Sequence, residues 1–366
     1  MKCYRITCII VFLFPLLKLN AQISYDRKTE VSIQGESFYL NGTLTLLGKQ
    51  WNGYKLEGLL PNSRMVQGIF DDLNPETVSK WKYPDNNTWD PERNTTEFVE
   101  AMPEWKKHGL LAFTINLQGG SPEGYTNFQP WYNSAITKEG DLREEYMERL
   151  ERIINKADDL GMVVILGIFY FGQDEHLKDE KAVISTVDNI VDWLFERNYK
   201  NVLIEINNEC NVNYDHEILK PERVHELIER VKSKKKNGRR FLVSTSYGGG
   251  FIPLPNVVKS ADYILVHGNG VHEPEKIIDM VKQIREMEEY TPKPIVFNED
   301  DHFNFDEPMN NFLAATSVYA SWGFFDYRKK GEGFDEGYQS VPINWKISSE
   351  RKKGFFLLLK EMTKEN

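Results

Sequence analysis

The fold class can be read from residues 143–176, which run REEYMERLERIINKADDLGMVVILGIFYFGQDEH. The first part of this stretch repeats apolar residues at helical spacing: Tyr146, Leu150, Ile153 and Ile154. This periodicity predicts a helix over Arg143–Leu160 that ends at Gly161. The next run, Met162–Phe171, is almost entirely apolar, as expected for a strand buried on both faces of a parallel sheet. Polar residues 172–176 then follow the expected strand.

The same alternation of strand and helix continues along the chain. Eight strand-like runs are expected: Met65–Phe70, Leu110–Leu117, Met162–Phe171, Val202–Ile206, Phe241–Ser244, Tyr263–His267, Ile295–Asn298 and Phe324–Tyr327. Longer helices are expected at Thr96–His108 (with Asn94 as cap), Arg143–Leu160, Ala182–Phe195, Pro221–Lys234, Pro274–Met287, Met309–Trp322 and Glu350–Met362. Eight such units predict an α/β fold, a single (β/α)8 TIM barrel. An open doubly wound sheet is disfavoured because no glycine-rich phosphate turn follows the first strand.

The N-terminal region predicts export and a hairpin. Residues 1–21 resemble a signal peptide, with an early Lys2 and Arg5, an apolar stretch over Ile6–Leu17 and a small residue, Ala21, at the expected cleavage point. That stretch is shorter than the ~20 residues of a membrane span, although an uncleaved anchor is the alternative. Residues 22–366 are expected to form one catalytic domain, with a β-hairpin at about 31–48 turning at Asn41-Gly42 and covering the lower mouth of the barrel.

Composition narrows the classes of partner. The chain has 45 Lys and Arg against 55 Asp and Glu, a net charge of −10, which is unfavourable for contacts with nucleic acid. No run after the signal is long enough to cross a bilayer, so the expected product is periplasmic or secreted. Of three cysteines only Cys210 lies beyond the signal, which leaves no internal disulfide and no CxxC metal site. No cofactor is expected, and the sequence does not indicate the oligomeric state.

Carboxylates stand at strand ends, where barrel enzymes place their chemistry. Glu209 follows the fourth strand directly after Asn208, and Glu299 follows the seventh. The fourth and seventh strands lie nearly across the barrel from each other, so these two carboxyl groups are expected to face one another over a central cleft. Paired carboxylates cleave glycosides: one protonates the leaving oxygen, and the other attacks or activates water.

These residues resemble the cellulase-like clan of retaining glycosidases. The resemblance rests on Ile206-Asn207-Asn208-Glu209 after the fourth strand, on Pro294–Glu299 at the seventh, and on the order of the units. It implies that Glu209 is the acid/base, that Glu299 is the nucleophile, and that Asn208 hydrogen-bonds the hydroxyl next to the anomeric carbon. Ordinary rim residues held in ion pairs are the alternative interpretation of the two glutamates.

Other strand-end and loop residues are candidate substrate contacts. His267 can orient a glutamate or touch substrate, and Tyr247 can hydrogen-bond the nucleophile. The further candidates are Gln118, Trp131, Asp326 and Arg328, with Trp131 expected to stack on sugars together with Tyr125 and Trp345, and Arg328 expected to bind an anionic sugar with Lys329 and Lys330. Packing in the core or in a solvated loop is the alternative for each of them.

The expected function is therefore an exported glycoside hydrolase acting on an oligo- or polysaccharide. An oligosaccharide dehydratase, which eliminates water from a sugar at the same site, is one alternative, and a non-catalytic glycan-binding barrel is another. The acidic run Asp300-Asp301-His302 after Glu299 is unfavourable for a nucleophile at Glu299, because neighbouring like charges raise the pKa of a carboxylate. No catalytic metal is expected, since the first strand has no His-x-His pair and the chain has no HExxH; structural calcium on the acidic loops stays open. A retaining enzyme should hold its two carboxyl groups about 5–5.5 Å apart, and an inverting one about 6.5–9.5 Å.

Overall fold

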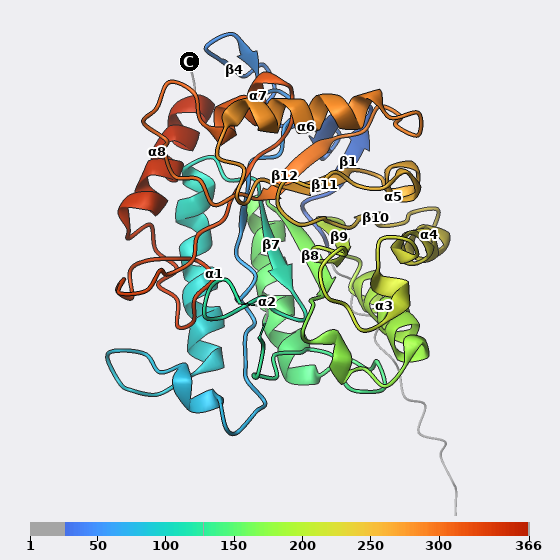
Figure 1. The fold of residues 1–366 in the computed structure, drawn as a ribbon, viewed down its shortest axis with the longest axis vertical. Helices are drawn as coiled ribbons and strands as arrows, with labels where there is room; N and C mark the ends of the chain where they lie inside the picture. Colours follow the sequence, from blue (N-terminus) through green and yellow to red (C-terminus); the bar gives the residue numbers. More distant parts are fainter. Residues whose placement is uncertain (1–25, 127, 365–366) are drawn as a thin grey trace, which may run out of the picture.

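The chain folds into a closed barrel of parallel strands surrounded by helices (Figure 1). The computed structural model describes residues 26–126 and 128–364. Among them, eight strands form the barrel: β6 (Asn62–Arg64), β7 (Ala112–Asn116), β8 (Val163–Phe169), β9 (Val202–Asn207), β10 (Leu242–Ser244), β11 (Ile264–His267), β12 (Ile295–Glu299) and β13 (Gly323–Phe324). Six of them pair in the order β10-β9-β8-β7-β6-β13, and β11 pairs with β12.

The two remaining seams of the barrel are closed by backbone contacts. Parallel bridges from Val296 to Ser321 and from Asp300 to Phe324 join β12 to β13. On the other side of the pair, the backbone N–H of Asp262 donates to the carbonyl of Val243 at 3.0 Å, which links β11 to β10. The expected (β/α)8 barrel is therefore confirmed.

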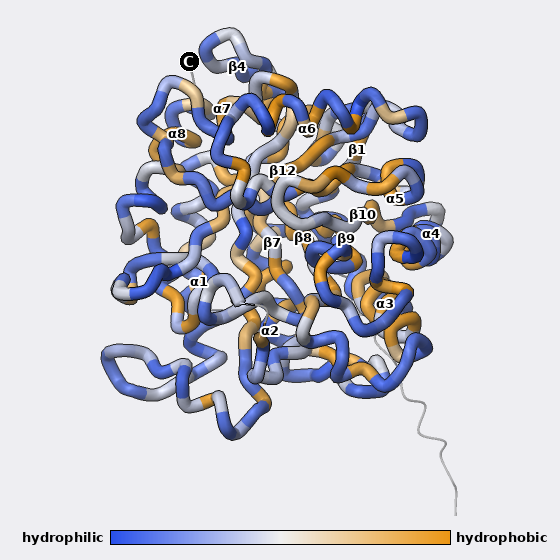
Figure 2. The backbone as a smooth tube through the Cα atoms, viewed as in Figure 1, coloured by the Kyte–Doolittle hydropathy of each residue, from blue (hydrophilic) through white to orange (hydrophobic). Residues whose placement is uncertain are grey.

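Helices cover the outside of the strands. The α-helices are α1 (Pro91–Lys107), α2 (Glu144–Leu160), α3 (Glu180–Glu196), α4 (Val224–Ser233), α5 (Pro255–Ser260), α6 (Pro274–Glu286), α7 (Asn311–Ser317) and α8 (Glu350–Thr363). Short 3-10 turns lie in three loops: η1 (Val78–Lys80), η2 (Asp174–His176) and η3 (Glu217–Leu219). Figure 2 shows hydrophobic residues gathered in the central strands and hydrophilic residues along the outer loops, so the core lies between strands and helices.

Several element boundaries differ from the sequence prediction, two of them at the start of the barrel. The first barrel strand is Asn62–Arg64, and residues 65–70, predicted as that strand, form a buried turn region. Hydropathy does not identify this strand because its three residues are polar. They are nevertheless buried, and their side chains are hydrogen-bonded inside the barrel. Helix α1 begins one turn earlier than predicted, because Asp90 accepts hydrogen bonds from the N–H groups of Glu92 and Arg93. Asn94 is instead an interior residue of this helix.

The N-terminal hairpin closes the lower mouth of the barrel. It is a three-stranded antiparallel sheet of β1 (Val31–Gln34), β2 (Ser37–Leu40) and β3 (Thr43–Leu44), followed by a small hairpin of β4 (Gln50–Trp51) and β5 (Tyr54–Lys55). Asn41 and Gly42 both adopt positive φ, at 51° and 76°, as the predicted tight turn requires. Phe38 is fully buried against Tyr263, with ring centroids 6.5 Å apart, so it plugs the bottom of the barrel.

The predicted signal peptide, residues 1–21, lies outside the described residues. Within residues 26–126 and 128–364, none of the helices has the length and apolar character that a membrane crossing needs.

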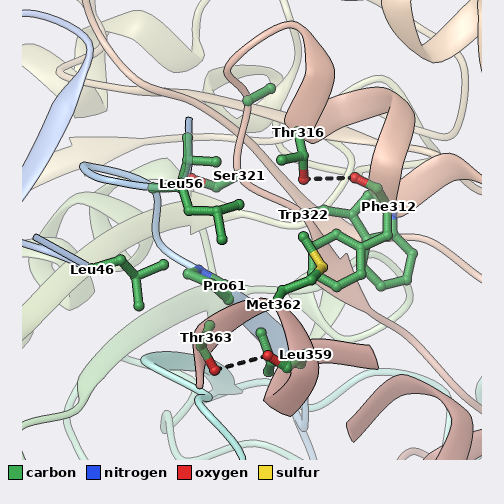
Figure 3. Close-up of a pocket in the computed structure, with 12 residues that line it drawn as sticks. Leu46, Leu56, Pro61, Phe312, Thr316, Ser321, Trp322, Leu359, Met362 and Thr363 are labelled. Carbon is green, nitrogen blue, oxygen red and sulfur yellow. Dashed lines mark hydrogen bonds between the residues drawn. The ribbon is translucent and has the colours of Figure 1, made fainter. Parts of the chain in front are cut away.

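An apolar seam joins the segment that follows the N-terminal hairpin to α7 and to the C-terminal helix α8. Figure 3 shows it between the segment after β3, helix α7 and helix α8. Leu56, Phe312, Trp322 and Leu359 face one another there, and the space between the side chains is only about 10 Å³. Such a gap is too small for a ligand, so the seam is a packing contact that fixes the C-terminal helix against the barrel.

Candidate active site

Two glutamates meet in a cavity at the C-terminal end of the barrel. Glu209 follows β9 and Glu299 ends β12, and one oxygen of each lies within 4.8 Å of the other and of a ring nitrogen of His267. Both glutamates line a cavity of about 490 Å³, with these other lining residues: Gly124, Tyr125, Thr126, Tyr170, Phe171, Val212 and Gln339. The cavity combines two carboxyl groups with aromatic surface, an arrangement that suits a polar ring with apolar faces.

The Glu299 carboxylate has a cation beside one oxygen and an amide donor on the other. Arg64 Nε lies 2.5 Å from Oε2, and Asn269 Nδ2 donates to Oε1 at 2.6 Å. Burial raises the pKa of Glu299, and the positive charge of Arg64 opposes that rise. A fixed cation and a fixed amide donor favour the ionised form, and they also hold the carboxylate in one orientation.

Glu209 has a different environment. Its backbone is in the left-handed region, with φ of 51°, and its N–H donates to Ser246 Oγ at 3.0 Å. This uncommon conformation turns the side chain from the end of β9 toward the cavity. The side chain is largely buried and contacts no cation directly, so burial raises the pKa of Glu209 to about 7. Glu209 is thus disposed to hold a proton near neutral pH. Burial also raises the pKa of Glu299, but Arg64 and Asn269 lie beside that carboxylate and oppose the rise.

His267 lies between the two glutamates. Its Nδ1 is 3.0 Å from Glu209 Oε1 and 3.6 Å from Glu299 Oε2, and its ring is completely buried at the end of β11. Burial lowers the pKa of His267, which favours the neutral imidazole. A neutral ring can hydrogen-bond Glu209 in either protonation state of that carboxyl, as donor or as acceptor.

Arg64 connects the floor of the site. Besides Glu299, it donates from Nη2 to Asn208 Oδ1 at 2.7 Å, and its Nη1 lies 3.9 Å from Glu205 Oε2. Arg64 and Glu205 are both buried in the barrel interior, so this group of charges is shielded from solvent. Asn208, which precedes Glu209 in the chain, is therefore linked to Glu299 by its hydrogen bond with Arg64.

Sequence analysis did not identify Arg64, Glu205 or Asn269. Arg64 lies in the polar strand that hydropathy misplaced, and Asn269 stands two residues beyond a strand end with no motif to mark it. Glu205 did leave a signal, because it is an acid within the apolar strand Val202–Asn207. A buried acid at such a position requires a partner, and searching for one leads to a buried cation.

Four predicted substrate contacts lie away from the cavity in hydrogen-bonded packing. Trp131 is buried against Trp81 and donates to Gln129, so its ring has no face free for a sugar. Gln118 is buried, and its Nε2 donates to the hydroxyl of Ser134 and to the backbone carbonyl of Gln173. Its Oε1 accepts from the backbone N–H of Tyr170. These two predictions are corrected to structural roles, because a strand-end position does not fix where a side chain points.

Tyr247 and Asp326 are corrected in the same way. The Tyr247 hydroxyl accepts from the N–H of Leu254 at 3.2 Å, and its ring is buried beside Cys210. Asp326 is fully buried and accepts from Arg351 Nε at 2.8 Å, which anchors helix α8. Neither residue lines the cavity that contains the two glutamates.

Arg328 is also occupied by its own loop. Its guanidinium donates to the backbone carbonyls of Gly333, Ser340 and Pro342, the last at 2.6 Å. These bonds hold the segment after β13, and they leave the predicted role as an anion-binding residue unsupported. Trp345 is likewise buried, whereas Tyr125 is half exposed and lines the cavity.

The acidic run after Glu299 is directed elsewhere. Asp300 is fully buried, and its carboxylate accepts from Trp322 Nε1 at 2.9 Å and from Asn311 Nδ2 at 3.0 Å. His302 Nδ1 lies 2.6 Å from the same carboxylate, and Asp301 accepts from the Tyr125 hydroxyl at 3.3 Å. Trp322, Asn311 and His302 therefore surround the Asp300 carboxylate, and it is burial that raises the pKa of Glu299.

Within residues 26–126 and 128–364, two clusters carry enough donor atoms for a metal ion: Glu209, His267 and Glu299, and Asp300, Asp301 and His302. Arg64 at the first cluster already supplies a positive charge to Glu299. In the second cluster, the donors just described already use Asp300 and the Nδ1 atom of His302.

Solved structures with the same architecture are glycoside hydrolases. A glycoside hydrolase family 5 structure from Bacteroides vulgatus matches with a TM-score of 0.56 at 13% identity, over 90% of this chain and 70% of that one. An endo-1,4-beta-mannanase from Rhizomucor miehei matches with a TM-score of 0.56 at 11% identity, over 92% of this chain and all of the other. A broad-specificity endoglucanase from Bacteroides salanitronis matches with a TM-score of 0.51 at 11% identity, over 83% and 93% of the two chains.

These similarities establish a shared fold. The chain spans 60% of another Bacteroides vulgatus protein that it matches, so some neighbours are considerably longer. No protein-family model matches the sequence, and no curated protein matches it either. The barrel implied by the resemblance to the cellulase-like clan is confirmed, and the reaction depends on the residues around Glu209 and Glu299.

Proposed function

We propose that this protein is a retaining glycoside hydrolase in which Glu299 is the nucleophile and Glu209 the acid/base. The observation that carries the proposal is the approach of the two carboxyl groups, with oxygens within 4.8 Å of each other at one cavity. A short approach of this kind supports double displacement, in which the carboxyl groups stand about 5–5.5 Å apart, over inversion, in which they stand about 6.5–9.5 Å apart.

The unequal environments support the assignment of roles. In the first step Glu299 attacks the anomeric carbon, the glycosidic bond breaks, and Glu209 gives its proton to the leaving oxygen. In the second step Glu209 takes a proton from water, whose oxygen displaces Glu299 from the anomeric carbon and restores both residues. Each cut consumes one water. The pKa of Glu209, raised to about 7, suits a group that must alternate between acid and base.

We further infer that the substrate is an uncharged oligo- or polysaccharide. The described residues that line the cavity include two acids and three aromatic side chains, and none of them is Lys or Arg. A uronic or sulfated sugar would place negative charge beside two carboxyl groups without a compensating cation. Tyr125, Tyr170 and Phe171 supply aromatic surface for the apolar faces of the rings. We also propose that residues 1–21 direct export of the protein, because polysaccharide substrates lie outside the cell.

Aryl glycosides of differing leaving-group ability test the two roles separately. With a nitrophenyl leaving group that departs without protonation, Glu209→Ala should retain the first step and accumulate glycosyl-enzyme, whereas Glu299→Ala should be inactive on every substrate. Glu175→Gln is the matched control, since Glu175 is an exposed glutamate at another strand end. Equal loss in both variants on the activated substrate would contradict the assignment.

The mass of the product distinguishes hydrolysis from the other chemistries. Hydrolysis adds one water for each bond cut, elimination removes one water without cutting the chain, and a binding protein leaves the glycan unchanged. Neutral glucan and mannan oligosaccharides should be tested beside uronic and sulfated ones. Turnover confined to the anionic glycans would overturn the inference about charge.

A further inference from the structure

Two histidines lie side by side on neighbouring loops at the rim of the barrel. His272 follows β11 and His302 follows β12, and His272 Nδ1 is 3.1 Å from His302 Nε2. The ring planes cross at 75°, with centroids 5.2 Å apart. We propose that these two imidazoles form a binding site for a divalent transition-metal ion, of which Zn²⁺ and Ni²⁺ are the test cases.

The distance between the nitrogens fits chelation of one ion. With metal–nitrogen bonds of about 2.0–2.1 Å and an angle of about 90–109° at the metal, two imidazole nitrogens stand about 2.9–3.4 Å apart. The same 3.1 Å is also an ordinary hydrogen bond between the rings, so distance alone does not separate the two. His272 is exposed, and a small rotation of its ring converts one arrangement into the other.

The surroundings of His302 are those of a metal ligand. Its Nδ1 lies 2.6 Å from Asp300 Oδ1, which fixes the ring orientation and directs Nε2 toward His272. A carboxylate behind a histidine of this kind selects the tautomer and makes the other nitrogen a stronger ligand. Asp300 itself is fully buried and is held by Trp322 and Asn311, so this support is rigid.

One residue ties the two loops together. Asn311 Nδ2 lies 2.9 Å from the carbonyl oxygen of Val271, next to His272, and 3.0 Å from Asp300 Oδ2. The two imidazoles are therefore brought together by the packing of the fold and not by a chance meeting of flexible side chains. Such preorganisation lowers the entropic cost of binding an ion. Water would complete the coordination of a site that opens to solvent through His272.

The site lies apart from the proposed catalytic pair but on the same loops. Asn269, three residues before His272, donates to Glu299, and Gly270 N lies 3.4 Å from Asp301 Oδ1. An ion bridging His272 and His302 would join the loops that follow β11 and β12. The inference does not depend on the proposed function, because metal binding can be measured without any substrate.

Calorimetric titration of the tag-free, chelator-treated protein tests the proposal. We expect Zn²⁺ and Ni²⁺ each to bind with a stoichiometry of one and to raise the melting temperature, and Ca²⁺, which prefers oxygen ligands, to do neither. His272→Ala should weaken binding by about tenfold or more, and since His272 is exposed this variant should fold normally. Asp300→Asn should weaken binding by about 10–100-fold.

Two controls make the outcome decisive. His108→Ala removes a histidine at the end of α1, which lies at the opposite end of the barrel, and should leave binding unchanged. Glu299→Gln removes a ligand from the other cluster, Glu209, His267 and Glu299. The proposal is overturned if no stoichiometric binding occurs, if His272→Ala binds like the wild type, or if Glu299→Gln abolishes binding.

Discussion

The raised pKa of Glu209 makes the free energy of unfolding depend on pH in a predictable direction. In the unfolded chain this carboxyl has its ordinary pKa of 4.5, and burial in the folded protein raises the pKa to about 7. At one pK unit per about 1.4 kcal/mol, ionising Glu209 costs the folded state about 3 kcal/mol above pH 7. Below pH 4.5 both states hold the proton and the cost is absent.

Replacement of Glu209 by Gln removes the ionisable group while keeping its size. The free energy of unfolding of Glu209→Gln, measured relative to the wild type, should therefore increase with pH by about 3 kcal/mol between pH 4 and pH 8. Any constant difference, such as an altered hydrogen bond to His267, shifts the whole curve without changing this increase. The stabilisation should develop between pH 4.5 and pH 7, the interval between the two pKa values.

Urea unfolding at a series of pH values, followed by tryptophan fluorescence, measures this dependence. The exposed Glu175 provides the control, because Glu175→Gln should show a difference that stays nearly flat with pH. A flat difference for Glu209→Gln as well would refute the claim that Glu209 is buried without adequate compensation. A difference that falls with pH would mean that the folded protein stabilises the anion, which would exclude Glu209 as a proton donor near neutrality.

Three further predictions concern the same framework. The pH profile of kcat/KM should fall on the alkaline side near pH 7, where Glu209 loses its proton, and stopped assays on a neutral oligosaccharide check this; a plateau beyond pH 9 would contradict it. Asn269→Ala removes the amide donor to Glu299 and should lower kcat by about 10–100-fold with the fold intact by circular dichroism, whereas an unchanged kcat would show that the contact is dispensable. Leu359→Ala opens the seam beneath α8 and should lower the free energy of unfolding by about 2–5 kcal/mol in urea, without changing KM; a loss below about 1 kcal/mol would mean that α8 is not firmly packed.

Hydropathy patterns located the parts of the site that follow apolar strands. Strands β9 and β12 are largely apolar runs themselves, so the positions of Glu209 and Glu299 at their ends followed from the sequence. The structure brings these two glutamates to one cavity, as expected. Asn208 and His267 were found for the same reason, and both contact the group of charges around the glutamates.

The remaining site residues escaped because their direction depends on distant neighbours. Arg64 belongs to a polar strand whose burial is possible only because Glu299, Glu205 and Asn208 surround it. Conversely, Trp131 and Arg328 occupy loops at the correct end of the barrel, yet one packs in the core and the other binds backbone carbonyls. Nothing local to these residues indicates whether they turn toward the cavity or away from it.

Local patterns in the chain were thus sufficient for the (β/α)8 architecture, since helix and strand periodicities depend on residues only a few positions apart. They also placed acids at the ends of opposite strands. The inequality between the two carboxyl groups came from tertiary structure alone, because Arg64 on β6 lies 2.5 Å from Glu299, whereas Glu209 is buried with no cation in direct contact. Electrostatic environment is a property of atoms close in space and distant in sequence, which is why only the folded chain could assign it.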